Sequence, residues 1–211
     1  MLSKLIKTSV ICLLTASVSA EDIKLPKPEI KGEKSLMEAL KARKTSREFS
    51  PEDLSSQQLS NLLWAAWGFN RPDQQKRTAP SAHNWQDMDV YVVMKKAAYV
   101  YDAQENKLKE ITKGDGRAAT GFQQFCKTAP VNLVYVSDQS TMKQAKSDKE
   151  KDHYSAIHAG LISQNVNLYC ASTDLATVVR GWFDATKVSN ILQLPKNKKV
   201  ILCQTVGKPA K

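Results

Sequence analysis

The residues best suited to bind a ligand are the five from Arg43 to Arg47, which read Arg-Lys-Thr-Ser-Arg. Three cations and two hydroxyls stand together directly after an expected helix. Two guanidinium groups can donate bidentate, charge-assisted hydrogen bonds to a phosphate, and hydroxyls can satisfy its remaining oxygens. A basic helix end also complements the helix dipole. By itself the segment therefore leaves a phosphate site and a structural role equally open.

Other chemistries lack the residues that they need. His153 and His158 are five apart on one expected helix, so they cannot form the i, i+4 pair of a zinc-binding helix, and no metal site is expected. The sequence has no Gly-x-Ser-x-Gly, no P-loop and no Gly-x-Gly-x-x-Gly, which argues against acyl transfer, Walker-type phosphoryl transfer and a Rossmann dinucleotide site. His83 is a weak candidate for a catalytic proton donor, because loop histidines are more often solvated or structural.

The first twenty residues have the three parts of a secretory signal peptide. A basic start is followed by a short apolar centre and by small residues ending at Ala20, just before Glu21. The apolar stretch is interrupted by hydroxyl residues and is shorter than the roughly 20 residues that a membrane span needs. We therefore expect cleavage near Ala20, an exported (periplasmic or secreted) protein, and no stable membrane anchor.

The net charge limits which kinds of partner we expect the protein to bind. The formal charge of +10 becomes +8 when Lys4 and Lys7 leave with the signal peptide. The densest lysine groups, at residues 143–151 and 196–199, alternate with acids or border a strand, and we interpret them as solvated faces. We expect no nucleic acid partner, and an anionic small ligand is the better use of a few of these charges.

The mature chain from residue 21 to 211 has a length that suits one domain with a sizeable core. Export would favour disulfides, but Cys126, Cys170 and Cys203 each stand in an apolar context. Buried free thiols are the expected state.

Capping boxes and apolar periodicity predict the helices. Ser35 with Glu38, and Ser55 with Gln58, each combine a hydroxyl at the N-cap with an acid or amide three residues later. Two prolines make residues 21–34 an extended arm ahead of the first helix. The expected helices cover residues 35–42, 55–68, 117–126, 149–172 and 187–192.

Apolar and β-branched runs predict five strands, at residues 90–94, 98–101, 107–111, 131–136 and 200–206. The second and third form a hairpin, and the fourth is typical of a buried central strand. Residues 69–86 form a long polar connection, and loops of more than about 12 residues are often functional. Strands and helices in this order predict an α+β layer sandwich.

Three polar segments, taken together, resemble the nitroreductase family. Members carry an Arg-Arg-Ser-x-Arg-like segment after the first helix, a Pro-Ser-x-x-Asn-x-Gln segment before the first strand, and a Gln-Asn pair ahead of a Gly-Leu-Gly-Thr-like loop. In this chain these are residues 43–47, 80–86, and 164–165 ahead of 174–177. Order and spacing match from about residue 35 to 209.

Residues 62–71 and 206–209 look similar to the SagB-type dehydrogenase branch of the family. The resemblance implies a nitroreductase-like α+β domain over residues 35–211, with a mixed sheet flanked by helices around a long central helix. It also implies FMN as the cofactor. We interpret Gln164 and Asn165 as buried hydrogen-bonding residues of the long helix rather than as catalysts.

The resemblance assigns cofactor contacts residue by residue. A first group holds the phosphate, a second meets the flavin and ribityl polar atoms, and a third places backbone N–H groups near flavin N5, which takes the hydride. In that order the groups are Arg43, Lys44, Thr45 and Arg47; Ser81 and Asn84; Leu175 and Ala176.

The chain departs from the family pattern at three places. Asp87 replaces a frequent proline, Ala176 replaces the glycine of the flavin loop, and the chain stops at Lys211 where many members add basic phosphate ligands. These departures bear on FMN affinity more than on the fold. Trp85 is as compatible with a wall of the cofactor pocket as with the core.

The resemblance implies an FMN-dependent oxidoreductase that transfers electrons or hydride through flavin N5, by a ping-pong mechanism, between a small-molecule donor and acceptor. The expected signal peptide makes it an exported one. The alternatives are a non-catalytic exported flavin-binding electron carrier or sensor, and a polyanion-binding protein on a flavin-free scaffold. Residues 149–172 carry apolar side chains beyond one face and need cover on nearly all sides. The resemblance implies two interlocked chains with each cofactor contacting both, so together they predict a homodimer with FMN at the subunit boundary.

Overall fold

The computed structural model describes residues 21–32 and 34–210. The expected signal peptide, residues 1–20, lies outside these described residues and stays a prediction. Within the described ranges, no helix combines the length and the apolar composition that crossing a membrane requires.

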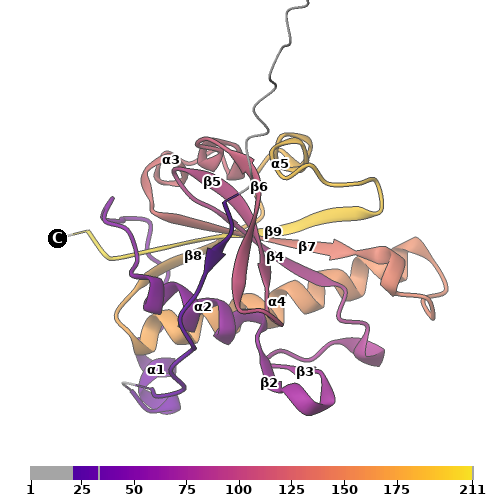
Figure 1. The fold of residues 1–211 in the computed structure, drawn as a ribbon, viewed down its shortest axis with the longest axis horizontal. Coiled ribbons are helices and arrows are strands. Elements are labelled where there is room, and N and C mark those ends of the chain that lie inside the picture. The colour runs from indigo at the N-terminus through magenta and orange to yellow at the C-terminus, as the bar shows by residue number, and fades with distance from the viewer. Residues whose placement is uncertain (1–20, 33, 211) are drawn as a thin grey trace, which may run out of the picture.

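The described chain forms three layers, with a twisted sheet between two layers of helices (Figure 1). One face of the sheet is covered by the long α4 together with α1 and α2, and the other by the short α3 and α5. The helices are α1 (Leu36–Ala42), α2 (Ser56–Trp67), α3 (Phe125–Thr128), α4 (Asp148–Ser172) and α5 (Ala185–Ile191). The predicted α+β fold around a long central helix is confirmed.

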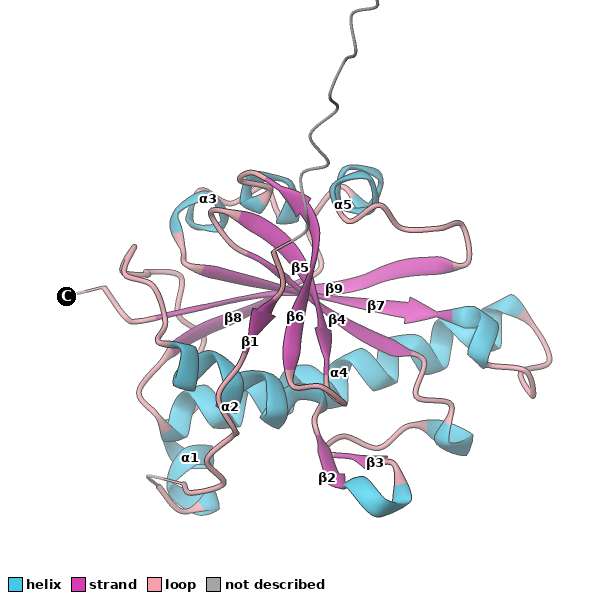
Figure 2. Cartoon of the chain, in the orientation of Figure 1, coloured by secondary structure: helices cyan, strands magenta, loops and turns pink. Residues whose placement is uncertain are grey.

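Seven strands form the main sheet in the order β1-β6-β5-β4-β7-β9-β8 (Figure 2). Every pairing in it is antiparallel, so the expected mixed sheet is wrong. Helix α4 connects two strands that run in the same direction, but β9 inserts between them and pairs antiparallel with both. The strands are β1 (Ile23–Lys24), β4 (Met88–Val93), β5 (Ala97–Asp102), β6 (Lys107–Lys113), β7 (Val131–Asp138), β8 (Ala176–Arg180) and β9 (Lys198–Gly207).

Alternation along the central strand β7 divides the core in two. Leu133 and Tyr135 belong to the cluster under α2 and α4, whereas Val134 and Val136 belong to the cluster under α5. Because successive side chains of a strand point to opposite faces, a strand buried on both sides is apolar throughout. The prediction of a buried central strand at residues 131–136 is confirmed.

Local sequence signals begin the helices as expected. In both predicted capping boxes the N-cap hydroxyl accepts from the N3 backbone and the N3 side chain accepts from the N-cap backbone. Gly68 follows the last residue of α2, and its N–H donates to the Trp64 carbonyl. Cys126, Cys170 and Cys203 are buried free thiols, as predicted.

The expected helix over residues 117–126 is wrong. The structure has a 3-10 turn at Arg117–Thr120, a break at Gly121, and then α3. The Thr120 carbonyl accepts from Arg180 Nη1 at 2.5 Å, and a Cβ on Gly121 would lie 2.0 Å from that same nitrogen. The chain therefore bends around a buried guanidinium, a contact that helical periodicity cannot reveal.

Four short strands were not predicted, and one of them is β1 in the N-terminal arm. Residues 69–86, expected to be a polar connection, contain a small hairpin of β2 (Phe69–Arg71) and β3 (Lys76–Arg77). The edge strand β8 follows α4, where only a loop was expected. Strands of two to five residues carry too few alternations to be recognised by period.

The N-terminal arm is extended, as predicted, but it is tied down. Ile23 pairs with Leu108 of β6, and the Pro26 carbonyl accepts from Ser60 Oγ at 2.5 Å and from Asn106 Nδ2 at 2.7 Å. These contacts fix the arm across the sheet edge and α2.

Candidate functional site

A cavity of about 320 Å³ lies where the end of α1, the end of α4 and the start of β8 meet. Two of the predicted segments, residues 43–47 and 174–177, contribute to its lining. The lining residues are Ala42, Lys44, Ser46, Glu48, Asn167, Cys170, Ala171, Asp174, Leu175, Ala176, Thr177, Pro209 and Ala210.

The basic segment runs along the edge of the sheet. Ser46 N–H donates to the Thr177 carbonyl of β8 at 3.0 Å. Lys44 and Ser46 line the cavity, whereas Arg43, Thr45 and Arg47 do not, which is the alternation of an extended chain. The latter three are exposed. Predicted phosphate ligands thus divide between the cavity wall and the adjacent rim.

The rim cations have no acidic partners. Neither Arg43, Lys44 nor Arg47 forms an ion pair with any carboxylate of the described residues. Three positive charges next to one cavity, with no ion-pair partner in the described part of the chain, favour an anionic ligand.

A buried amide network forms the polar floor of the cavity. Gln204, fully buried on β9, donates through Nε2 to Thr177 Oγ1 and to Asn167 Oδ1, at 2.9 Å each. Its Oε1 accepts from the Tyr135 hydroxyl at 2.5 Å. Sequence reasoning missed Asn167 and Thr177 as cavity-lining residues. The signal was present, since Asn167 lies one turn beyond Gln164 and Thr177 ends the predicted loop motif.

The loop before β8 is fixed by the protein itself. Asp174 adopts a left-handed φ of 54°, and Leu175 N–H donates to the Cys170 carbonyl at 2.9 Å. This N–H, predicted to approach flavin N5, is therefore already used. Burial raises the pKa of the Cys170 thiol, which lines the cavity as a neutral group.

The structure does not bring the third predicted segment to this cavity. Ser81 and Asn84 line a separate cavity of about 240 Å³ beside the β2–β3 hairpin. His83, Asn84 and Gln86 have φ values of 50°, 54° and 45°. Non-glycine residues in this region are strained, so the surrounding structure must hold the loop in place.

A buried Asp-His pair holds that loop. Ala82 N–H donates to His158 Nε2 at 2.8 Å, and His158 Nδ1 lies 2.6 Å from Asp87 Oδ1. Both side chains are 1% exposed, and Ser137 Oγ donates to Asp87 Oδ2 at 2.8 Å. Because Nε2 accepts, the proton is on Nδ1 and the imidazole is neutral. Asp87, which departs from the family pattern, therefore stabilises the loop through its hydrogen bond with His158.

Trp85 belongs to the core. It is 7% exposed, its ring packs edge-on against Tyr154 with centroids 5.3 Å apart, and its Nε1 donates to Gln144 at 2.5 Å. His83 is exposed and lies against this ring, with centroids 4.8 Å apart. Its proposed role as a proton donor stays a prediction.

Three other sequence interpretations have clear outcomes. Asn165 is half-buried and donates to the Ala65 carbonyl at 3.1 Å, as expected for a helix residue. Gln164 is exposed, so its expected burial is wrong. Lys208 pairs with Glu52 and lines a neighbouring cavity, not the one beside residues 43–47.

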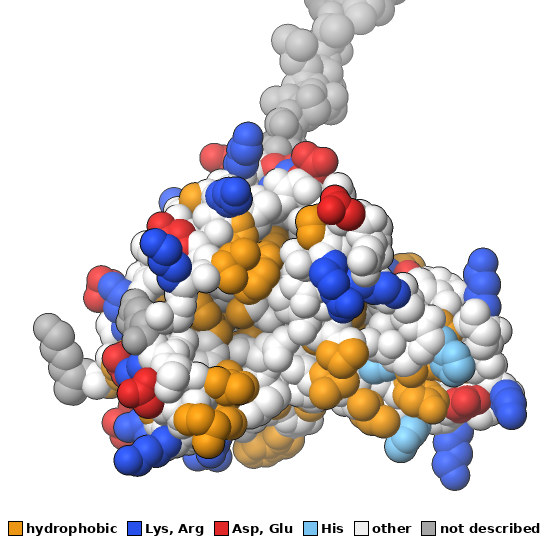
Figure 3. Space-filling view, turned by 90° about the horizontal axis from the view of Figure 1, so that it is seen from below, with side chains coloured by type: hydrophobic (Ala, Val, Ile, Leu, Met, Phe, Trp, Pro, Cys, Tyr) orange, Lys and Arg blue, Asp and Glu red, His pale blue; other side chains and the backbone are white. Residues whose placement is uncertain are grey.

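The side of the molecule formed by α1 and α4 is apolar. Figure 3 looks at the molecule from below and shows hydrophobic side chains in several groups on this face. Five large apolar residues there are more than a third exposed, namely Leu36, Met37, Leu40, Ile157 and Leu161. In a single chain these side chains have no cover.

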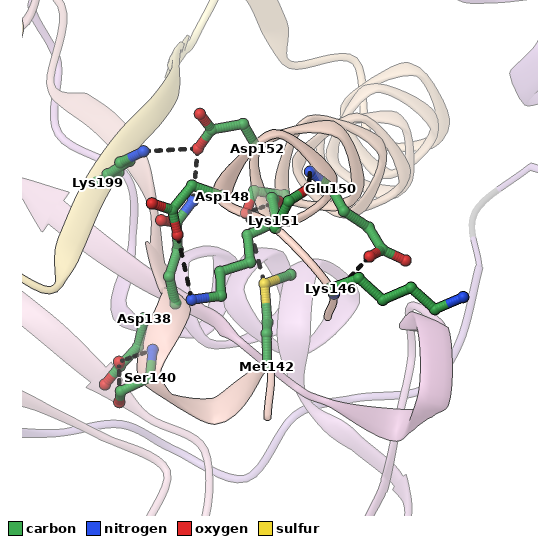
Figure 4. Close-up of polar contacts among 12 residues, drawn as sticks. Asp138, Ser140, Met142, Lys146, Asp148, Glu150, Lys151, Asp152 and Lys199 are labelled. Carbon is green, nitrogen blue, oxygen red and sulfur yellow. Dashed lines mark hydrogen bonds and ion pairs between the residues drawn. The ribbon is translucent and has the colours of Figure 1, made fainter. Parts of the chain in front are cut away.

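The N-terminal end of α4 has a different character, because two of its lysine contacts are ion pairs with aspartates (Figure 4). Lys199 Nζ lies 2.7 Å from Asp152, and Lys151 Nζ lies 3.3 Å from Asp148. The interpretation of residues 143–151 and 196–199 as solvated faces fits this pairing. Among the described residues, no three His, Cys, Asp or Glu side chains are grouped so as to hold a metal ion.

Comparisons with known proteins agree on one family. Residues 40–208 match the model of the nitroreductase family. A crystal structure from Ralstonia eutropha JMP134, of a protein assigned as a nitroreductase, is 39% identical, has a TM-score of 0.85, and matches over 90% of each chain. A Methanocaldococcus jannaschii protein, also assigned as a nitroreductase, is 26% identical over 183 residues, 82% of this chain and 90% of its own.

The fold extends to more distant structures. The NADPH:FMN oxidoreductase of Vibrio harveyi, solved with NAD+, is 21% identical with a TM-score of 0.60, over 83% of this chain and 69% of that one.

Proposed function

Because the chain belongs to the nitroreductase family, we propose that it is an FMN-dependent oxidoreductase acting between a small-molecule electron donor and acceptor. One observation carries the proposal: a 320 Å³ cavity bordered by the unpaired cations of residues 43–47. Its volume is within the range of small-molecule sites, about 300–1,000 Å³. Its rim supplies the donors that a phosphate needs.

The residues of the basic segment would contact FMN in two different ways. Arg43, Thr45 and Arg47 would hold the phosphate at the rim, and Lys44 would add charge from the cavity wall. FMN, when bound, supplies hydride transfer at N5, which permits a ping-pong exchange between donor and acceptor. With Leu175 N–H donating inside the protein, the loop would meet the flavin mainly through Ala176.

We propose that the active form is a homodimer with FMN at the subunit boundary. Within one chain the Ser81–Asn84 loop and the cavity beside residues 43–47 are separate, so a cofactor that touches both sets draws one of them from a second copy. The exposed apolar residues of α1 and α4 supply a surface to bury. An obligate interface of about 2,000 Å² or more is expected. Light scattering at micromolar concentration tests this, and a monomer with and without FMN would contradict it.

We also propose that the protein is exported after cleavage near Ala20. The basis is the composition of residues 1–20 alone. Mass spectrometry of protein recovered from its host should give Glu21 as the first residue, and a retained Met1 would overturn the assignment.

The spectrum of the purified protein tests the cofactor. Oxidised flavin absorbs at about 450 nm, so the protein should be yellow, and released FMN should approach one per chain. Colourless protein that takes up no added FMN would refute the proposal. Steady-state assays with several electron donors then separate an enzyme from a flavin-binding carrier or sensor, which would be coloured but would not turn over.

A further inference from the structure

The cavity beside the β2–β3 hairpin has a basic wall. Arg71, Lys76 and Arg77 come from the two hairpin strands, and Ser81, Asn84 and Gln86 come from the loop that follows. The volume of about 240 Å³ suits one small group rather than a whole cofactor. Antiparallel pairing sets Arg71 opposite Lys76 and so places two cations side by side.

The three hairpin cations have no acidic partner among the described residues. None of Arg71, Lys76 and Arg77 forms an ion pair with a described carboxylate. The nearest acids in sequence are Asp73, exposed in the hairpin turn, and Asp87, buried with His158. Adjacent like charges repel, so without an anion this arrangement is unfavourable.

Contacts within the protein fix the position of the Arg77 guanidinium. Its Nε donates to Gln86 Oε1 and its Nη1 to the Trp67 carbonyl, both at 2.8 Å. Its guanidinium lies 4.1 Å from the Phe69 ring centroid and 4.9 Å from that of Trp67. Burial lowers the pKa of Arg77 even though the charges of Asp89 and Asp102 act to raise it, which reflects the cost of keeping this guanidinium half-buried. Nη2 makes no hydrogen bond to the described residues.

The loop side of the cavity also presents donors. Gln86 Nε2 donates to Asn84 Oδ1 at 3.2 Å, which leaves the Asn84 NH₂ group to donate to a ligand. Gln86 N–H donates to Ser81 Oγ at 3.0 Å, so the Ser81 hydroxyl proton is also available. The cavity thus offers several donors that are still free to bond, and three of its lining side chains carry a positive charge.

We propose that the hairpin cavity recognises a carboxylate or phosphate group on the small molecule that exchanges electrons with the protein. An anion is the ligand class that accepts from all these donors and cancels the repulsion of Arg71 and Lys76. Since Ser81 and Asn84 belong to both the cavity and the expected flavin contacts, this rests on the proposed function. The inference adds to the proposed function that the protein prefers an anionic electron donor or acceptor to a neutral one.

A matched pair of probes tests the inference. 4-Nitrobenzoate and 4-nitrobenzamide have nearly the same shape and differ in charge, and calorimetric titration of the purified protein as isolated needs no turnover. The wild type should bind the benzoate more tightly. Replacing two cations in Arg71→Gln/Lys76→Gln should lower this preference by about 10- to 100-fold, as expected for two charge-assisted bonds. Both side chains lie in a surface hairpin, so the double variant should fold.

A charge-matched control is available in two exposed lysines that do not line the cavity. Lys143→Gln/Lys146→Gln removes the same charge near the start of α4, and should leave the preference unchanged. Equal binding of both probes by the wild type, or an equal loss of preference in the control, would overturn the inference. Inorganic phosphate and benzoate, added as competitors, identify the anion type, and failure of both to compete would also contradict it.

The failure of the inference differs from the failure of the proposed function. Colourless protein that still prefers the benzoate through Arg71 and Lys76 would keep the anion site and lose the flavoenzyme. Yellow protein that binds both probes equally would keep the flavoenzyme and lose the anion site. Loss of FMN from the Arg71→Gln/Lys76→Gln variant would assign these cations to the cofactor and so refute recognition of a reaction partner.

Discussion

At the N-terminal end of α4, Lys151 and Lys199 each have a carboxylate partner, whereas the cations of residues 43–47 and of the β2–β3 hairpin form no ion pair within residues 21–32 and 34–210. The two kinds of region look alike in sequence, because each is a short run rich in Lys and Arg. Paired exposed charges are nearly neutral in energy. Unpaired cations beside a cavity keep their full attraction for an anion. Unpaired cations that border a cavity, rather than density of charge alone, therefore mark a candidate binding site.

The largest effect is expected where an ionic group is buried. His158→Ala would leave the Asp87 carboxylate buried without its imidazole partner, and would remove the acceptor of Ala82 N–H. Leaving a buried carboxylate without its hydrogen-bond partner costs about 3 kcal/mol or more, well above the value of an exposed pair at the start of α4. Urea unfolding should show the loss, and FMN affinity should fall because the loop is released.

The control for this variant is His153→Ala, which removes an exposed histidine one turn away on the same helix. A similar loss of stability in both variants would show that the Asp87–His158 pair does not anchor the loop.

An intermediate effect is expected at the cavity rim. Arg43→Ala or Arg47→Ala removes a charge-assisted bond of roughly 1.5–3 kcal/mol, so FMN affinity should fall about 10- to 100-fold while the fold survives. Flavin fluorescence during titration of the apoprotein gives the affinity. Lys199→Ala, in the paired region, serves as the reference and should bind FMN like the wild type. Full flavin occupancy in both arginine variants would remove the phosphate assignment.

The smallest effect is expected in the paired region itself. Asp152→Asn should change the free energy of unfolding by less than about 1 kcal/mol, because the pair with Lys199 is exposed. Hydrogen bonds from Lys199 and then from Gln139 hold the pKa of Asp152 below its ordinary 3.8. The stabilisation is therefore complete above that ordinary pKa and is lost as the pH falls through the lower folded value.

Unfolding curves of Asp152→Asn and the wild type should accordingly converge as the pH is lowered from about 7 toward 3. A difference that grows on acidification would show that the carboxylate is not stabilised by its partners, and would weaken the contrast between the two regions.

The features that the sequence predicts well are determined by residues that are close together in the chain. The capping boxes at Ser35 and Ser55 need only three or four consecutive residues, and both are present. The basic segment and the loop at 174–177 were predicted as one site, and the Ser46–Thr177 hydrogen bond brings them together. These predictions depended on a family pattern or on short-range geometry.

What the sequence missed depends on distant contacts. The break at Gly121 is caused by Arg180, about 60 residues further along the chain. The anchoring role of Asp87 needs His158, 71 residues away. The outward direction of Arg43 and Arg47 follows from how the segment lies along β8. Neither period nor composition contains such information.

The N-terminal arm has a consequence for the order of folding. Lys34 donates to the Ala171 carbonyl at 3.2 Å and pairs with Asp174 at 2.5 Å, across 137 and 140 positions of sequence. Contacts of such separation form late, because closing a long loop must follow the local structure that rewards it. We expect the arm to dock after α4 and β8 have assembled. Until then the edge of β6 is open to pairing with another chain. Asp174 at the cavity rim also lacks its ion pair with Lys34 during that time.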